Sequence, residues 1–290
     1  MFTGALSAIV TPFRDGTIDE KALRDLIEWQ ISEGIEGIVP CGSTGESATL
    51  SHAEHEQVIK IAVEQTRKRV PVVAGTGSNS TAEAIRLTAA AREMGADAAL
   101  LISPYYNKPT QEGIYKHYKM IAQSVDLPII IYNIPGRTGS NIAPETMARM
   151  CEVRNIVGVK EASGSMDQVS DIHRLCGDRW TILSGDDSAT LPLMALGASG
   201  VISVITNIMP REMVEMTSAA LKQDYARARE IHYRMLPLMR ALFIETNPIP
   251  IKHAMSLLGK CSPEVRMPLT PMSSVAADKL KGVMKEMGLL

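Results

Sequence analysis

The sequence predicts an α/β fold, a (β/α)8 TIM barrel followed by a C-terminal helical extension. Eight short apolar runs alternate with longer segments of helical period. Most of these runs lack polar alternation, as expected for parallel strands that helices cover. An open, doubly wound sheet gives the same alternation, and the count of eight favours the barrel. Only helical patterns follow Arg211, so we predict a barrel over residues 1–223 and an extension over residues 224–290 that packs on it.

The predicted strands are short runs rich in Val, Ile and Ala. In chain order they are Leu6–Val10, Gly37–Val39, Val70–Ala74, Ala98–Ile102, Pro128–Tyr132, Ile156–Val159, Thr181–Leu183 and Gly200–Val204. Polar residues follow most of them. A barrel places its active site at these carboxyl ends of the strands.

The segments between the runs carry the signals of helix ends. Ser51 and Glu54 match a capping box, Pro144 suits a first helical turn, and Gly34 and Gly95 stand where a helix end needs a left-handed residue. Further helices are predicted to open at Asp19, Thr81 and Thr110. Three more helical segments follow the strands: Met213–Glu230, Ala241–Gly259 and Val275–Met287. The first of them belongs to the last helix of the barrel.

The composition is that of an ordinary globular protein. Hydrophobic residues make up 45% of the 290 residues and charged residues 21%, which excludes a disordered chain. The 30 basic and 32 acidic residues give a formal net charge of −2, so we expect no nucleic acid bound by bulk charge. We also expect no membrane partner, no secretory leader and a cytoplasmic location. The four isolated cysteines are expected to be reduced thiols: Cys41, Cys151, Cys176 and Cys261.

Lys160 is the most informative residue, because it ends the buried-strand pattern Ile156–Val159. A buried ammonium is either paired or has a lowered pKa. An ordinary lysine is neutral in only about one molecule in several thousand at pH 7, and only the neutral amine attacks a carbonyl. Two interpretations follow. Lys160 is a Schiff-base lysine, or it is paired with a carboxylate such as Glu161 or Asp186.

Two other strand ends carry groups that suit carbonyl chemistry. Tyr132 ends the preceding strand, about 4.8 Å away in a parallel sheet, and its phenol can exchange protons with a carbinolamine. It could instead be an aromatic residue that lines the barrel. Arg137 follows in the next loop, where a guanidinium binds a carboxylate with two hydrogen bonds. The alternative for Arg137 is an ordinary surface charge.

The loop Gly42–Ser47 offers glycines and small hydroxyls to an anion before a helix begins. It is not a phosphate-binding P-loop, because the lysine of that motif is missing. His52 and His55 stand three residues apart, but no third ligand accompanies them, so we expect no metal site.

Together these residues resemble the pyruvate-dependent class I aldolase family that includes N-acetylneuraminate lyase. The matching segments are Gly42–Glu46, Tyr132–Thr138, Val159–Ala162, Ser184–Asp187 and Asn247–Lys252. Within the family, Pro104–Pro109 and Arg137 match the branch that condenses pyruvate with L-aspartate 4-semialdehyde. Ser43 departs from this branch, which usually has threonine there; serine is typical of the neuraminate lyases and keeps the hydroxyl.

The resemblance implies a role for each matching residue. Lys160 forms an imine with pyruvate, without a metal or an organic cofactor. The proton relay consists of Tyr132, Ser43 and Tyr106, the last reaching in from a partner subunit. Arg137 binds the carboxylate of the semialdehyde. Three residues contact the pyruvate end: Thr44, Gly185 and Ile202.

The resemblance also implies a site for L-lysine as a feedback inhibitor at a subunit interface. Its residues are Ser47, Ala48, His52, His55, Asn79, Glu83 and Tyr105. Glu83 can meet an ammonium group, while Asn79 and Tyr105 can bond a carboxylate; the alternative is an ordinary polar interface. A homotetramer built as a dimer of dimers is implied as well.

Two other functions remain compatible with the sequence. One is a lyase of the same family that acts on N-acetylneuraminate or a 2-keto-3-deoxy sugar acid; Arg137 disfavours it and Ser43 permits it. The other is a non-catalytic metabolite-binding protein on the same barrel, since a fold does not fix a function. A binding protein predicts a damaged relay, whereas every relay residue is present.

Overall fold

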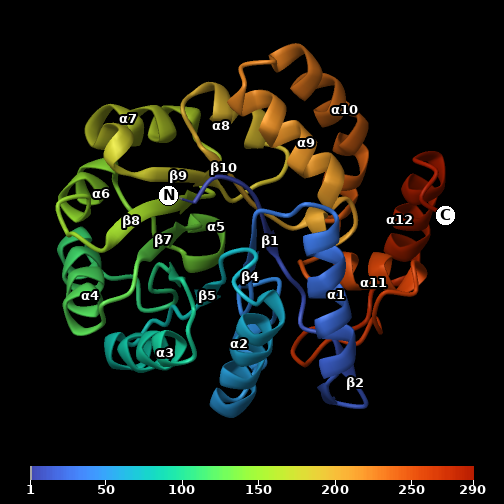
Figure 1. Cartoon of the computed structure of the whole chain (residues 1–290), viewed down its shortest axis with the longest axis horizontal. Coiled ribbons are helices and arrows are strands. Elements are labelled where there is room, and N and C mark those ends of the chain that lie inside the picture. The colour runs from blue at the N-terminus through green and yellow to red at the C-terminus, as the bar shows by residue number, and fades with distance from the viewer. Residues whose placement is uncertain (1) are drawn as a thin grey trace.

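The computed structural model describes residues 2–290 and contains one eight-stranded parallel sheet that curves into a barrel (Figure 1). The strand order is β4-β1-β10-β9-β8-β7-β6-β5, and a bridge between Ile38 and Val72 brings the two ends of the sheet together. The predicted barrel is confirmed. Its strands are β1 (Gly4–Ala8), β4 (Gly37–Val39), β5 (Val73–Gly75), β6 (Ala98–Ile102), β7 (Ile129–Asn133), β8 (Ile156–Glu161), β9 (Thr181–Ser184) and β10 (Gly200–Ser203).

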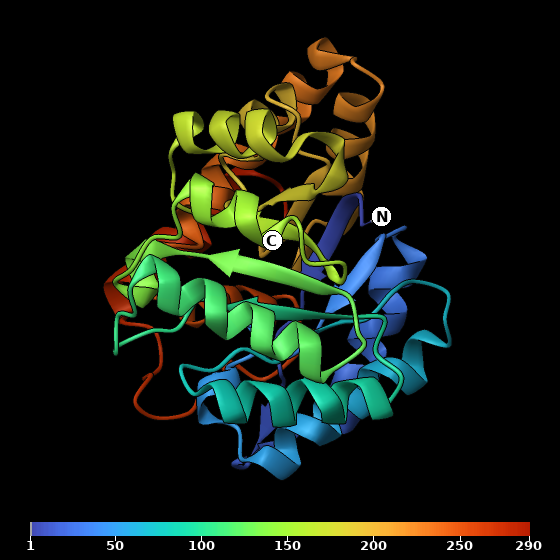
Figure 2. The same ribbon diagram turned by 90° about the vertical axis from the view of Figure 1, so that its left-hand side faces the viewer.

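Helices connect successive strands and cover the outside of the barrel (Figures 1 and 2). This arrangement explains why the strands are apolar without alternation, since one face meets the helices and the other fills the barrel. The connecting helices are α1 (Glu20–Ser32), α2 (His52–Thr66), α3 (Thr81–Glu93), α4 (Gln111–Ser124), α6 (Pro144–Met150), α7 (Met166–Cys176) and α8 (Thr190–Ala195). Helix α9 (Pro210–Leu221) follows the last strand.

The helix ends follow the local sequence closely. Asp19 and Thr110 accept hydrogen bonds from the first turns of α1 and α4, and Ser51 forms the predicted capping box with Glu54. Gly34 and Gly95 have the predicted positive φ, at 89° and 91°. Helix α3 begins at Thr81, as predicted, and Ser80 before it is the cap that accepts from the Glu83 N–H.

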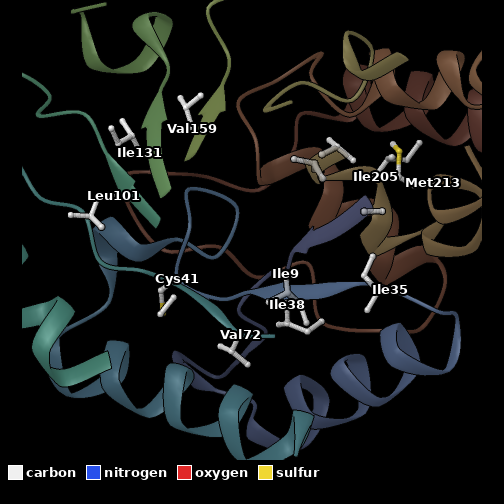
Figure 3. Packing of buried hydrophobic residues seen from close by; sticks show 14 of the residues in the cluster. Ile9, Ile35, Ile38, Cys41, Val72, Leu101, Ile131, Val159, Ile205 and Met213 are labelled. Carbon is white, nitrogen blue, oxygen red and sulfur yellow. The ribbon is translucent and has the colours of Figure 1, made fainter. Parts of the chain in front are cut away.

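Alternate residues of each strand enter two separate cores. Ile131 and Val159 point outward from neighbouring strands β7 and β8 into the layer between barrel and helices, together with Ile38 of β4 (Figure 3). The inner core fills the barrel and contains Leu6, Ala8, Val39, Val73, Ala98, Leu100, Ile130, Tyr132, Leu183 and Ile202. Any polar side chain on an inward position is therefore surrounded by the barrel wall.

The C-terminal region is helical, as predicted, but two predicted boundaries are wrong. Met213–Glu230 is not one helix, because α9 ends at Leu221 and α10 (Tyr225–Ala241) begins after a turn that Asp224 caps. Ala241–Gly259 is interrupted as well, since α11 (Ile249–Leu257) begins only after Pro248. The last helix, α12 (Ser274–Glu286), lies within one residue of the prediction at each end. The proposed division between residues 223 and 224 falls in the turn before α10.

Several short elements were not predicted from the sequence. A two-stranded hairpin, β2 (Phe13–Arg14) and β3 (Thr17–Ile18), follows β1, and a one-turn helix α5 (Pro135–Thr138) follows β7. Such elements are too short to show a period. None of the helices within residues 2–290 combines the length and apolar character needed to cross a membrane.

Gly158 tests how tightly the barrel wall is packed. A Cβ at this position in β8 would lie 2.3 Å from the Thr181 carbonyl oxygen of β9, so Gly158→Ala must push two backbones apart. We expect a loss of about 1–3 kcal/mol in the free energy of unfolding, measured as a lower urea midpoint. The matched control is Gly282→Ala in α12, where a Cβ meets nothing within 4 Å and helix propensity improves. Equal midpoints for the two variants would contradict this packing.

Candidate active site

Strand pairing brings the two principal candidates together. Tyr132 of β7 and Lys160 of β8 are register partners, and Lys160 pairs in turn with Leu183 of β9. Partners in register share a face of the sheet, and Tyr132 and Leu183 belong to the inner core. Lys160 therefore points into the barrel, where its side chain is only 6% exposed.

The Lys160 amine is buried, and among residues 2–290 no carboxylate lies at ion-pair distance from it. Its Nζ is 4.3 Å from the centroid of the Tyr132 ring. Burial lowers the pKa of this amine to about 7; the negative charge of Asp187 opposes the shift and Arg137 adds to it. The neutral, nucleophilic form of the amine is therefore much more populated at neutral pH than in an ordinary lysine.

The two carboxylates considered as partners for Lys160 are bonded elsewhere. Glu161 accepts hydrogen bonds from Asn133, from Gln168 and from the backbone N–H of Ser163. The Asp186 carboxylate accepts from the N–H and hydroxyl of Ser188. The geometry thus favours the nucleophile over the paired lysine.

Tyr132 is held as a neutral phenol. Burial raises the pKa of its hydroxyl to about 12, although the Arg137 charge lowers it. At neutral pH the group keeps its proton and can donate it. Tyr132 is one of the residues that border a cavity of about 500 Å³.

The same cavity gathers most of the predicted site residues. Its walls include Ser43, Arg137 and Asn247, and it continues to a second group of predicted residues. That group comprises Ser47, Ala48, His52, His55, Glu83 and Tyr105. One hollow therefore links Tyr132, Ser43 and Arg137 with residues assigned to L-lysine. The other predicted site residues are not among those that line it: Lys160, Thr44, Gly185, Ile202, Tyr106 and Asn79.

The loop after β4 contributes two hydroxyl groups. Ser43 lines the cavity, whereas Thr44 is buried and its Oγ1 accepts a hydrogen bond of 3.0 Å from Nδ2 of Asn247. The backbone carbonyl oxygen of Asn247 also accepts a 3.1 Å hydrogen bond from the Arg137 guanidinium. Asn247 lies in the C-terminal extension, so residues far apart in the sequence meet at the cavity.

Gly185 and Ile202 shape the surroundings of the Lys160 side chain. A Cβ at Gly185 would lie 3.1 Å from Cε of Lys160 and 2.7 Å from Cβ of Ala162. Any residue with a Cβ at position 185 would therefore crowd the Lys160 side chain. Ile202 of β10 is buried in the inner core with Tyr132.

Tyr106 is not brought into this site within a single chain. Its side chain is 90% exposed and its backbone φ is 70°, a left-handed value that is uncommon for an aromatic residue. The predicted role in a relay therefore depends on a neighbouring subunit.

The second group of residues is already joined by hydrogen bonds. The Glu83 carboxylate accepts from Ser78 Oγ at 2.5 Å and pairs with His52 Nε2 at 2.9 Å. Asn79 donates to the Tyr105 carbonyl oxygen at 3.2 Å. Ring nitrogen Nε2 of His55 bonds the Gly75 carbonyl oxygen, and burial lowers the pKa of this imidazole. Within residues 2–290, no three His, Cys, Asp or Glu side chains are grouped as metal ligands.

The sequence analysis assigned no role to Asp187, whose charge acts on Lys160, and considered Glu161 only as a partner for that lysine. Asp187 is buried, and one of its carboxylate oxygens accepts from the N–H groups of Val204 and Ile205. Burial raises the pKa of this carboxyl to about 6. Glu161 ties β8 to β7 through Asn133, and Asn133 also bonds Asn141. The adjacent pair Asp186–Asp187 was visible, but only the fold shows which one is buried.

Comparisons with known proteins place this chain in a family. A model of the dihydrodipicolinate synthetase family matches residues 1–287. The chain belongs to this family. The chain is 59% identical to a 4-hydroxy-tetrahydrodipicolinate synthase of Syntrophus aciditrophicus, over 100% of both chains. A solved dihydrodipicolinate synthase from Aquifex aeolicus is 53% identical, with a TM-score of 0.98 and 99% of each chain covered.

Two other family structures contain small molecules, and a third is a monomeric variant. A chloride-inhibited dihydrodipicolinate synthase from Acinetobacter baumannii, complexed with pyruvate, is 45% identical with a TM-score of 0.98 and full coverage of both chains. The enzyme from Cyanidioschyzon merolae, with lysine bound, is 39% identical with a TM-score of 0.97 and covers 100% of this chain and 99% of its own. A monomeric dihydrodipicolinate synthase variant is 41% identical, with a TM-score of 0.98, and covers 100% of this chain and 98% of its own.

The lowered pKa of Lys160 predicts an unusual pH dependence of its reactivity. Because only the neutral amine reacts, trace labelling with acetic anhydride should rise with pH around a midpoint near 7. Lys21 serves as the internal control, since its bond to Asp25 raises its pKa above 10.5. Asp187→Asn removes the negative charge that favours the ammonium form of Lys160. The labelling midpoint of Lys160 in this variant should therefore fall below the wild-type value. Mass spectrometry of the two lysine peptides measures both midpoints. A Lys160 midpoint near 10 would exclude the desolvated amine.

Proposed function

We propose that this family member is a lyase of the class I aldolase type that condenses pyruvate with L-aspartate 4-semialdehyde to 4-hydroxy-tetrahydrodipicolinate, in lysine and diaminopimelate biosynthesis. The observation that carries the proposal is the buried Lys160 amine, with a pKa of about 7 and Nζ 4.3 Å from the Tyr132 ring. The close relatives with this enzyme's name support the same activity.

The first half of the reaction activates pyruvate. The neutral Lys160 amine adds to the ketone carbon, and the carbinolamine loses water to give an imine. Tyr132 keeps its proton at neutral pH because burial raises the pKa of its phenol, so it can protonate the departing hydroxyl. Loss of a methyl proton from the imine then gives an enamine whose terminal carbon is nucleophilic.

The second half joins the two substrates and frees the enzyme. The enamine carbon attacks the aldehyde carbon, and the resulting alkoxide takes a proton. The amino group of the semialdehyde then adds to the imine carbon, which closes the ring and expels the Lys160 amine. Arg137 borders the cavity and is assigned to the carboxylate of the semialdehyde, since a guanidinium binds carboxylates through two parallel bonds.

The pyruvate end and the relay use the loop after β4. Thr44, Gly185 and Ile202 surround the pyruvate end, and Ser43 passes protons between Tyr132 and Tyr106. Tyr106 reaches the relay from a neighbouring subunit, which accounts for its 90% exposure in a single chain. The proposed assembly is a homotetramer of two such dimers, located in the cytoplasm.

L-Lysine is proposed to inhibit the enzyme by binding the second group of residues. Glu83 and His52 form the polar pair at 2.9 Å, and the Glu83 carboxylate suits the ammonium group of lysine. Asn79 and Tyr105 are assigned to the lysine carboxylate. The family structure from Cyanidioschyzon merolae with lysine bound supports this ligand.

Lys160→Ala tests the nucleophile, and substrate dependence tests the reaction. Wild-type protein should consume pyruvate only when L-aspartate 4-semialdehyde is present, and borohydride should trap pyruvate on Lys160 as a mass increase. Lys160→Ala should give no adduct and lose activity by about 10³-fold or more, because the covalent route is removed. Lys21→Ala is the surface control. A trapped adduct without semialdehyde-dependent consumption would instead favour a sugar-acid lyase.

Glu83→Gln tests the proposed inhibitor site. Loss of this carboxylate removes a charge-assisted bond to the lysine ammonium, so the concentration of L-lysine that halves the rate should rise about tenfold or more. The rate without lysine should stay near the wild-type value. Glu112→Gln in α4, which removes a carboxylate bonded to Arg149, is the matched control. A wild-type rate that does not respond to L-lysine would reject the site.

A further inference from the structure

The loop after β4, residues 41–47, has a conformation that its own sequence does not favour. Cys41 and Glu46, close to its two ends, both have left-handed backbones, with φ of 56° and 55°. Residues with a Cβ adopt this conformation only where surrounding groups hold them in it. Ser43 and Thr44 lie between them, so whatever holds the ends also places the two hydroxyls.

Glu46 is held by the C-terminal extension rather than by its neighbours in the barrel. Its carboxylate is buried, and Oε1 lies 2.7 Å from Nζ of Lys252 in α11. The other oxygen, Oε2, accepts a 3.0 Å bond from the backbone N–H of Arg266. Both oxygens of the carboxylate are thus bonded to residues more than two hundred positions later in the chain.

Lys252 is as completely buried as any side chain of the barrel, with an exposed fraction of 0%. Its Nζ also donates to the Thr11 carbonyl oxygen at 2.9 Å and lies 4.2 Å from the centroid of the Phe13 ring. Burial lowers the pKa of this amine, and the Glu46 carboxylate opposes the shift. The ammonium therefore joins the loop after β1 to the loop after β4.

The backbone of Glu46 transmits this anchorage to the catalytic hydroxyl. The Glu46 N–H donates to the Ser43 carbonyl oxygen at 3.2 Å, and the Gly45 carbonyl oxygen accepts from Thr11 Oγ1 at 2.7 Å. A displacement of Glu46 thus moves the peptide that carries Ser43. A buried ion pair is weak as a source of stability, because an apolar pair of similar volume stabilises a core as well. The directional hydrogen bonds of the buried pair are better suited to holding the loop in one position.

We propose that Lys252 and Glu46 are a positioning pair for the proton relay, which fixes Ser43 over the imine formed on Lys160. This inference rests on the proposed function of the site. It adds that part of the catalytic geometry is set by the C-terminal extension. Glu46 borders the cavity, but its two carboxylate oxygens are bonded to Lys252 and Arg266. We assign both residues of the pair an action through the loop of residues 41–47.

The first test is a neutral pair, Lys252→Met with Glu46→Gln, which keeps the volume and removes both charges. The readout is the exchange of pyruvate methyl protons with D2O, followed by NMR. Exchange requires proton removal from the imine and needs no second substrate. We expect at least a tenfold slower exchange, while borohydride still traps pyruvate on Lys160. Exchange within twofold of the wild-type rate would overturn the proposal.

A double-mutant comparison separates positioning from general destabilisation. In a Ser43→Ala background the relay hydroxyl is absent, so the neutral pair should slow exchange by less than twofold further. An equal loss in both backgrounds would overturn the proposal. Lys260→Met is the matched control: this lysine belongs to the same extension and lies 3.3 Å from the Trp29 ring centroid, away from the loop. Its exchange rate should match the wild type.

Glu46→Asp keeps the charge and shortens the side chain by one methylene group. This variant is the alternative test if the neutral pair does not fold. Severalfold slower exchange in a folded Glu46→Asp protein would support positioning, and an unchanged rate would overturn it. Failure of the proposed function gives a different result. Wild-type protein would then exchange methyl protons yet consume no pyruvate with the semialdehyde, while the effect of the pair on exchange would persist.

Discussion

The candidate site depends on the burial of the Lys160 amine, which removes it from water. Lys160 occupies an inward position of β8 and lies against the Tyr132 ring, while the adjacent carboxylate of Glu161 faces the other way and bonds Asn133 and Gln168. The alternation of side chains along a strand separates these two neighbours. A one-residue shift of β8 would exchange them, giving the barrel a carboxylate and the outer core an ammonium. The register of β8 therefore determines that Lys160 is the residue buried in the barrel, and this burial lowers the pKa of its amine.

The remaining groups tune this amine from the other strands. Asp187, at the end of β9, supplies a buried negative charge that keeps the pKa from falling further, and Arg137 acts in the opposite sense. The glycine that follows β9, Gly185, leaves the lysine chain its space. These residues follow the carboxyl ends of strands: Gly185 and Asp187 come after β9, and Arg137 comes after β7. The barrel therefore converts positions that are scattered over the sequence into one electrostatic environment.

The sequence predicted those parts of the molecule that depend on local chemistry. Apolar runs without alternation identified all eight strands, and a lysine at the end of such a run was recognisable because burial of an ammonium is costly. The helix break after Leu221 was missed because its apolar spacing continues through the turn. Lys252 was visible only as part of a family-like segment. Its ion pair joins residues with a sequence separation of 206, which no local pattern reveals, and the depth of its burial is a property of the assembled fold.

That separation has a consequence for the order in which the protein is made. Synthesis delivers Tyr132 and Lys160 long before Lys252, and α11 follows the last barrel strand by 46 positions, from Ser203 to Ile249. A nascent chain can therefore complete its barrel wall and bury its amine while the loop near Glu46 still lacks its anchor. Contacts of such long range form late in folding, since the intervening chain must first be ordered. A chain that ends before residue 252 contains Lys160 but lacks the Lys252 amine that bonds Glu46.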